Sequence, residues 1–171
     1  MKKKIIILFA SKKEANQFLF HSEFKFKKEE DFYLSLINNL TVKVYITGIG
    51  KANVINFLTK HKFDSDLHLV IKAGAVALLD KSLPLLTPFI PESVIYKNDE
   101  LKINTDKLDS EIKERVYSYM IDKKLVTVDE SLDSIEKIST YNNHTFADME
   151  TFHILKEYKT SSFLPILVPT D

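Results

Sequence analysis

The sequence has 171 residues, 44% of them hydrophobic, which suits one compact domain with a sizeable core over residues 1–171. Its 24 basic and 24 acidic side chains balance and are interspersed, so no nucleic-acid-binding surface is indicated. Without cysteine, disulfides and thiolate metal sites are excluded, and no segment approaches membrane-spanning length. We therefore expect a cytoplasmic protein that binds no nucleic acid or membrane and uses neither a metal nor a cofactor.

Apolar runs and helical periodicity alternate along the chain. The run at residues 5–10 is too short for a signal peptide and predicts a buried first strand, and Ser11 is placed to cap the helix that follows. Three prolines within residues 84–91 exclude a regular central strand there. The strands expected are 5–10, 24–26, 32–37, 42–47, 67–73, 93–96, 124–128, 145–147 and 163–168. The helices expected are 12–21, 52–61, 108–121 and 149–158.

Strands that alternate with helices predict an α/β layered fold whose central sheet is largely parallel and is flanked by helices. Such sheets bind ligands at the carboxyl ends of their strands. The only three glycines follow two of the expected strands: Gly48 and Gly50 after residues 42–47, and Gly74 after residues 67–73. Because glycine permits positive φ and a close approach of a ligand to the backbone, these positions predict a binding site. Tight turns are the alternative interpretation.

Several carboxylates are expected at the same edge of the sheet. They are Glu14, Asp129, Glu130, Asp148, Glu150 and Asp171. Carboxylates suit general acid–base chemistry and accept hydrogen bonds from the hydroxyls of a sugar, although acids in loops are commonly solvated surface groups. The sequence has one arginine, Arg115, and no P-loop, which argues against phosphate as a bound co-substrate. The histidines show no metal-ligand spacing.

The segments that carry this chemistry follow a recognisable order. In chain order they are Glu14 at the start of the first helix, Gly48-Ile49-Gly50-Lys51, Gly74 to Leu79, Val128-Asp129, Asp148-Met149-Glu150 and Thr170-Asp171. This order resembles the nucleoside phosphorylase superfamily, and most closely its methylthioadenosine/S-adenosylhomocysteine nucleosidases. That family has a catalytic glutamate, a Gly-Ile-Gly-Lys segment, a Gly-Ser-Ala-Gly-Gly-Leu turn, a Gly-Asp turn, a Glu-Met-Glu ribose-binding motif and a last strand that ends in Ser-Asp. The similarity extends over nearly the whole chain.

The resemblance implies a three-layer phosphorylase/hydrolase-like fold and hydrolysis of the N-glycosidic bond of an adenine nucleoside. Asp171 would protonate the departing adenine, and Glu14 would orient and deprotonate the attacking water. Glu150 would hold the ribose hydroxyls while Met149 packs against the sugar. The substrate-binding residues that it implies are Gly48, Gly50, Gly74, Ala75, Asp129, Met149 and Glu150. It also implies a homodimer, for which Val54, Phe57 and Leu58 offer an apolar helix face unless they belong to the core.

Some residues depart from the family pattern. Ala75 replaces the serine of the glycine-rich turn, Ala77 and Leu78 replace its paired glycines, and we expect no counterpart of the family's C-terminal helix. These departures keep a second hypothesis open, an inactive homologue that binds nucleosides without cleaving them or serves as an interaction protein. A phosphate-dependent phosphorylase is the third.

Overall fold

The structure is a computed structural model that describes residues 3–62, 67–81, 83–158 and 162–170. Its strands are β1 (Lys3–Phe9), β2 (Lys27–Lys28), β3 (Phe32–Ile37), β4 (Leu40–Ile46), β5 (Leu69–Leu78), β6 (Ile90–Tyr96), β7 (Asp99–Lys102), β8 (Met120–Thr127), β9 (Phe146–Asp148) and β10 (Phe163–Thr170). Its helices are α1 (Lys12–His21), α2 (Lys51–Lys60), α3 (Ser110–Tyr117), α4 (Ile135–Ser139) and α5 (Thr151–Tyr158), with a 3₁₀ turn at Thr105–Lys107.

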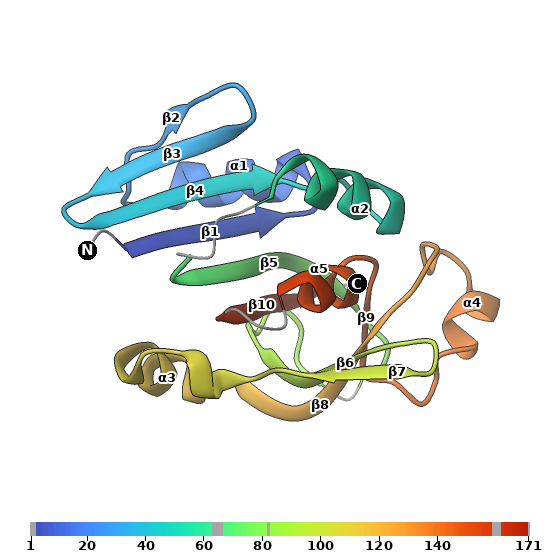
Figure 1. Ribbon diagram of the computed structural model, residues 1–171. Helices are drawn as coiled ribbons and strands as arrows, with labels where there is room; N and C mark the ends of the chain where they lie inside the picture. Colours follow the sequence, from blue (N-terminus) through green and yellow to red (C-terminus); the bar gives the residue numbers. More distant parts are fainter. Residues whose placement is uncertain (1–2, 63–66, 82, 159–161, 171) are drawn as a thin grey trace.

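The strands form one strongly bent sheet in the order β2-β3-β4-β1-β5-β9-β8-β6-β7, and β10 pairs with β5 (Figure 1). The pairs β1–β4, β1–β5, β5–β10, β6–β8 and β8–β9 are parallel, while the β2–β3, β3–β4, β5–β9 and β6–β7 pairs are antiparallel. The predicted largely parallel sheet is therefore confirmed.

The alternation of side chains along β1 produces a layer on each face of the sheet. Ile7 and Phe9 pack with Ala15 of α1 on one face, whereas Ile6 and Leu8 belong to the core cluster shared with α2 and α5 on the other. Successive side chains of a strand point to opposite faces, so a strand that is apolar at every position is covered on both. Helix, sheet and helix therefore form three layers.

β5 is the strand that joins the two halves of the sheet. Its first residues pair with β1, and its last two, Ala77 and Leu78, pair with β9. Its other edge pairs with β10 along nearly its full length, and a bridge between Phe89 and Leu167 connects β10 to the start of β6. Strands β5, β9, β8, β6 and β10 thus form a ring beside the first half of the sheet.

The structure corrects three of the expected elements. Residues 24–26 are not a strand; Phe26 instead packs edge-on against Phe18, with ring centroids 5.8 Å apart. The helix expected over residues 108–121 ends at Tyr117, because pairing with β6 draws Met120 into β8. β7, α4 and the 3₁₀ turn were not expected, since each is too short to show a periodicity.

The third correction concerns the strand expected over residues 67–73. It does not end before Gly74, because β5 continues through Gly74 to Leu78. The helix face of Val54, Phe57 and Leu58, considered above for a dimer contact, belongs to the core. Val54 and Phe57 are buried in the main core cluster, and Leu58 packs against it. Within the described ranges, no helix combines the length and the apolar character that crossing a bilayer requires.

Candidate active site

Glu14 is held by the start of its own helix and by β5. Its Oε2 accepts hydrogen bonds from Ser11 N at 2.9 Å and from Ser11 Oγ at 2.8 Å, while Ser11 Oγ accepts from Glu14 N at 3.2 Å. This reciprocal arrangement is the capping box that a Ser-x-x-Glu sequence favours. The other oxygen, Oε1, accepts from Ala75 N at 2.8 Å. The carboxylate is therefore fixed between α1 and β5 while remaining partly exposed.

Gly74 is required by the approach of that carboxylate. A Cβ placed on Gly74 would lie 2.6 Å from Glu14 Oε1 and 3.1 Å from Lys72 Nζ. The first distance is too short for any real contact, so a side chain here would displace the carboxylate. The group that approaches Gly74 closely is a side chain of the protein itself, and the approach of a ligand to this glycine stays a prediction.

Glu150 lies between β9 and α5, and its carboxylate reaches the start of α2. It is 4% exposed, and its Oε1 accepts a hydrogen bond from Gly50 N at 2.8 Å. Gly50 is the N-cap of α2 with φ of 85°, a conformation that favours glycine, and the positive end of a helix dipole stabilises an anion placed there. Burial nevertheless raises the pKa of the Glu150 carboxyl, and the charge of Asp148 adds to the rise, whereas Lys72 and the Gly50 N–H oppose it.

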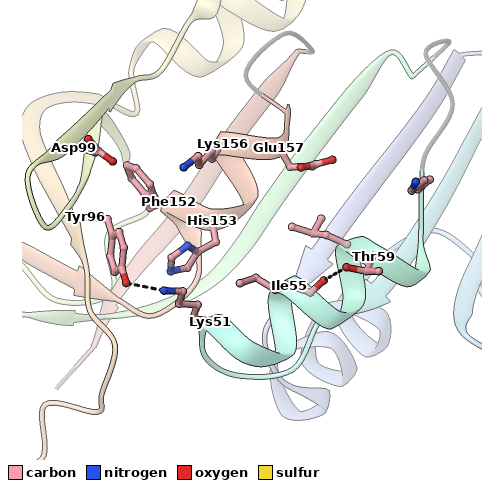
Figure 2. A pocket seen from close by; sticks show the side chains of 11 residues that line it. Lys51, Ile55, Thr59, Tyr96, Asp99, Phe152, His153, Lys156 and Glu157 are labelled. Carbon is pink, nitrogen blue, oxygen red and sulfur yellow. Dashed lines mark hydrogen bonds between the residues drawn. The ribbon is translucent and has the colours of Figure 1, made fainter.

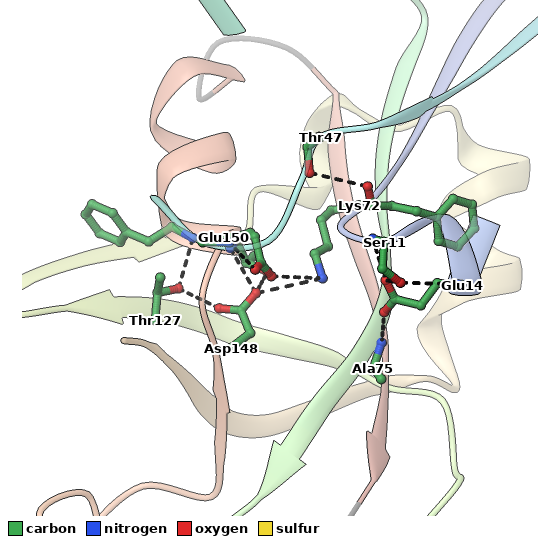
Figure 3. A network of polar contacts seen from close by, with 12 residues as sticks. Ser11, Glu14, Thr47, Lys72, Ala75, Thr127, Asp148 and Glu150 are labelled. Carbon is green, nitrogen blue, oxygen red and sulfur yellow. Dashed lines mark hydrogen bonds and ion pairs between the residues drawn. The ribbon is translucent and has the colours of Figure 1, made fainter. Parts of the chain in front are cut away.

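The carboxylate of Asp148, which lies near Glu150, is hydrogen-bonded to neighbouring parts of the fold. Its Oδ1 accepts from Thr127 Oγ1 at 2.7 Å, and its Oδ2 accepts from Thr151 N at 2.9 Å and also from Thr151 Oγ1. Thr127 Oγ1 in turn accepts from Phe152 N at 3.1 Å. Both carboxylate oxygens are thereby used to join β8, β9 and the first turn of α5, which fixes the backbone that carries Glu150 (Figure 3).

These groups border a cavity of about 480 Å³. Its polar lining residues are Ser11, Glu14, Glu130, Ser131, Asp148, Glu150 and Thr170. The apolar lining consists of Ala10, Ile49, Ala75, Val76, Ala77, Leu78, Leu79, Val128, Leu132, Ile138, Ala147 and Met149. A pocket of this volume, apolar with a few convergent polar groups, is typical of a small-molecule site. Carboxylates in the lining suit sugar hydroxyls, and its apolar side chains suit the faces of a flat base.

The structure brings four of the sequence-predicted site residues to this cavity: Glu14, Ala75, Met149 and Glu150 all line it. Gly50 and Gly74 support it from behind through the contacts given above. Gly48 shapes the turn that leads to α2, with φ of 84° and a Cβ position only 2.6 Å from Asn53 Cβ.

One predicted residue, Asp129, is placed differently. Asp129 is not among the residues that line the cavity; its Oδ1 accepts from Tyr96 Oη at 2.8 Å, a bond that lowers the pKa of this carboxyl. Asp171 lies outside the described residues, so its role stays a prediction. The sequence reasoning missed Lys72, whose signal was a lone lysine within the apolar run at residues 67–73, and Ile49, which also lines the cavity.

A second cavity, of about 560 Å³, opens between α2, α5 and the β6–β7 hairpin (Figure 2). Lys51 donates from Nζ to Tyr96 Oη at 3.0 Å at one end of it, and the His153 ring packs edge-on against the Tyr96 ring. Burial lowers the pKa of His153, which favours the neutral imidazole. Neither Glu14 nor Glu150 lines this cavity.

The sequence matches no family model and no curated protein. The fold, in contrast, is similar to solved structures. An MTAN of Chlamydia trachomatis has a TM-score of 0.75 at 22% identity, over 100% of this chain and 82% of that one. An MTAN of Helicobacter pylori has a TM-score of 0.75 at 14% identity, over 99% and 89%. The futalosine hydrolase of the same organism has a TM-score of 0.77 at 14% identity, over 100% and 88%.

These likenesses show that the chain has the same α/β fold as these solved structures, which agrees with the predicted α/β layered fold. The shared fold extends over essentially the whole of this chain.

Proposed function

We propose that the protein hydrolyses the N-glycosidic bond of an adenine nucleoside and releases the free base. The observation that carries this proposal is the convergence of Glu14 and Glu150 on one cavity, although 136 positions separate them in the sequence. The two carboxylates are held by unlike partners: three donors from Ser11 and Ala75 fix the first, while the second is buried against the start of α2. Two carboxyl groups in different environments can take different roles in one reaction.

In this proposal Glu14 is the general base. It accepts a proton from a water molecule whose oxygen attacks the anomeric carbon as the bond from that carbon to the base nitrogen breaks. The electron pair of the broken bond stays on the base. Glu150 in its ionised form accepts hydrogen bonds from the ribose hydroxyls, and Met149, which also lines the cavity, packs against the sugar. We assign the general acid that protonates the departing base to Asp171.

The proposed substrate class is methylthioadenosine or S-adenosylhomocysteine. The apolar lining that includes Leu132 and Ile138 suits the purine, and the alanine and leucine that replace the family's glycines leave a cavity of about 480 Å³. Among the proteins with this fold, one structure of the Chlamydia trachomatis MTAN holds MTA and another holds adenine. A reaction of this kind in the cytoplasm would contribute to methionine salvage.

We also propose that the protein acts as a homodimer. Ile49 precedes the N-cap of α2 and Ile55 lies in the middle of that helix; they are 57% and 48% exposed, and Ile49 lines the cavity. A second copy that covered these side chains would complete the apolar lining of the site. Light scattering behind a size-exclusion column measures the mass directly, and a monomer at all protein concentrations would reject the homodimer.

The test is an assay of adenine release from methylthioadenosine and S-adenosylhomocysteine, each with and without added phosphate. We expect release without phosphate, and we expect Glu14→Gln and Glu150→Gln to abolish it. A requirement for phosphate would favour a phosphorylase. Thermal stabilisation by a nucleoside without any release of base would favour a homologue that binds without cleaving.

A further inference from the structure

Lys72 places a positive charge in the interior of the protein. It lies in the middle of β5, its side chain is 1% exposed, and its Nζ has no hydrogen-bond partner among the residues that the structure describes. Burying an ammonium group is costly unless nearby negative charge compensates it. The run of apolar residues around it would form the same strand with a valine at this position, so the fold alone does not account for the lysine.

The compensating charges are the carboxylates of the candidate site. Lys72 Nζ is 3.8 Å from Glu150 Oε2 and 3.9 Å from Asp148 Oδ2. On the other side of Lys72, its Nζ and Glu14 Oε1 both lie close to Gly74. A Cβ built on Gly74 would be 3.1 Å from Lys72 Nζ and 2.6 Å from Glu14 Oε1. Lys72 therefore lies between the two glutamates (Figure 3), behind the cavity wall and not among the residues that line it.

We propose that Lys72 is a positioning residue whose buried ammonium keeps Glu150 ionised beside Glu14 at the cavity. The inference rests on the function proposed above and deepens it, because that reaction needs both carboxylates in their charged forms at the same time. Two like charges close to each other in a buried site otherwise drive one of them to bind a proton. A cation placed between them removes that conflict without occupying space that the substrate needs.

The groups that face Glu150 have opposing effects. Asp148 of β9 and Glu14 of α1 favour its neutral form, as burial does, whereas Lys72 of β5 and the Gly50 N–H at the start of α2 favour its charged form. Of these, Lys72 is the sole positive side chain within salt-bridge distance of Glu150 among the described residues. Removal of its charge therefore shifts Glu150 toward the protonated carboxyl at neutral pH.

The test is the substitution Lys72→Met, which keeps most of the buried methylene chain and removes the ammonium. The titration of Glu150 is followed by carbon NMR of protein labelled at the glutamate carboxyl carbons, with the signal assigned from Glu150→Gln. We expect its midpoint to rise by about one pH unit or more, and the acid limb of kcat/KM for base release to move by the same amount. At a pH below both midpoints, kcat/KM then falls about tenfold or more relative to the unmodified protein and recovers as the pH is raised.

The matched control is Lys124→Met, the same change at an exposed strand lysine whose partner, Glu100, is remote from the cavity. It should leave both the titration of Glu150 and the pH profile where they are. An unchanged titration of Glu150 in Lys72→Met would overturn the inference. The NMR titration needs no turnover, so an inactive unmodified protein would reject the proposed function and still leave this inference open to its own test.

A second pair of variants covers the case in which Lys72→Met does not fold. Asp148→Asn removes one buried negative charge from the cluster. Adding Lys72→Met in that background removes one positive charge, so the double variant has the same net charge in the cluster as the unmodified protein. The inference expects the same upward shift of Glu150 between Asp148→Asn and the double variant. Identical titrations in these two proteins would reject it.

Discussion

Glu14 Oε1 accepts a hydrogen bond from Ala75 N at 2.8 Å, which joins the first turn of α1 to the middle of β5 across 61 positions of sequence. The bond explains how β5 can contribute to the site without a glycine-rich turn. The strand continues past Gly74, and its backbone N–H at Ala75 points at the carboxylate from the cavity side. The separation of the two ends of this bond in sequence makes its consequences testable by single substitutions.

Glu14→Gln is expected to abolish base release while leaving the protein folded. Glutamine keeps an oxygen that can accept from Ala75 N, but its amide cannot take a proton from water. Loss of a general base typically costs about 10²-fold or more in rate. The measurement is kcat for adenine release together with the thermal unfolding midpoint. Glu111→Gln, at an exposed glutamate paired with Arg115, is the matched control and should leave kcat unchanged. Equal rates for Glu14→Gln and the unmodified protein would remove Glu14 from the mechanism.

Gly74→Ala is expected to lower both activity and stability. The new methyl group would begin 2.6 Å from Glu14 Oε1 and 3.1 Å from Lys72 Nζ, so the carboxylate has to move out of its bond with Ala75. Overpacking of this kind costs about 1–3 kcal/mol of the free energy of unfolding. Urea unfolding measures that loss.

A double-mutant cycle identifies its cause. In a Glu14→Ala background the obstructing carboxylate is absent, so Gly74→Ala should cost markedly less there. The same loss in both backgrounds would show that the strain comes from the strand itself.

The capping box and the order of the elements could be read from the sequence, because both depend on local patterns. Ser11 and Glu14 are three positions apart at the start of a periodic segment, and that spacing is enough to predict their mutual hydrogen bonds. The cluster of Asp148, Glu150 and Lys72 could not be derived in this way. Asp148 lies in β9, Glu150 follows that strand, and Lys72 lies in β5. Strand pairing brings β9 and β5 together, and no local pattern encodes that pairing.

The boundaries that were wrong have the same origin. Met120 carries the helical periodicity of the segment before it, yet it pairs with Ile90 as part of β8. Glycine after an apolar run is typical of a strand end. At Gly74, however, β5 pairs with β10 on one edge and with β9 on the other, and this pairing continues the strand through the glycine. In both places a partner distant in sequence decides the structure.

Glu150 is expected to make the stability of the protein fall as the pH rises. Burial raises the pKa of its carboxyl above the ordinary value of 4.5, so the folded state retains a proton that the unfolded chain has already lost. The contribution of Glu150 to stability is fully present at a pH below its pKa in the unfolded chain. It is lost as the pH rises through its pKa in the folded protein. Urea unfolding of the unmodified protein and of Glu150→Gln from pH 4 to pH 8 measures the effect.

We expect the free energy of unfolding of the unmodified protein to decline relative to that of Glu150→Gln over this range. Glu23→Gln, at an exposed glutamate after α1, is the control. Its free energy of unfolding plotted against pH should run parallel to that of the unmodified protein. Parallel curves for Glu150→Gln as well would mean that Glu150 titrates alike in the folded and unfolded states. Base release should rise over the same range, because the ribose hydroxyls need the ionised carboxylate.

Thr127→Val is expected to destabilise the protein and disturb Glu150 from a distance. Thr127 Oγ1 donates to Asp148 Oδ1 at 2.7 Å and accepts from Phe152 N at 3.1 Å, and all of these atoms are buried. Valine has nearly the same shape and makes neither bond, so a buried carboxylate oxygen and a backbone N–H each lose a partner. Each such loss costs about 1–3 kcal/mol. Thr59→Val is the matched control, since the exposed Thr59 hydroxyl donates only to Ile55 O of its own helix, and its unfolding midpoint should change little. If Thr127→Val were no more destabilising than Thr59→Val, the hydrogen bonds of Asp148 would not be what fixes β9 to α5.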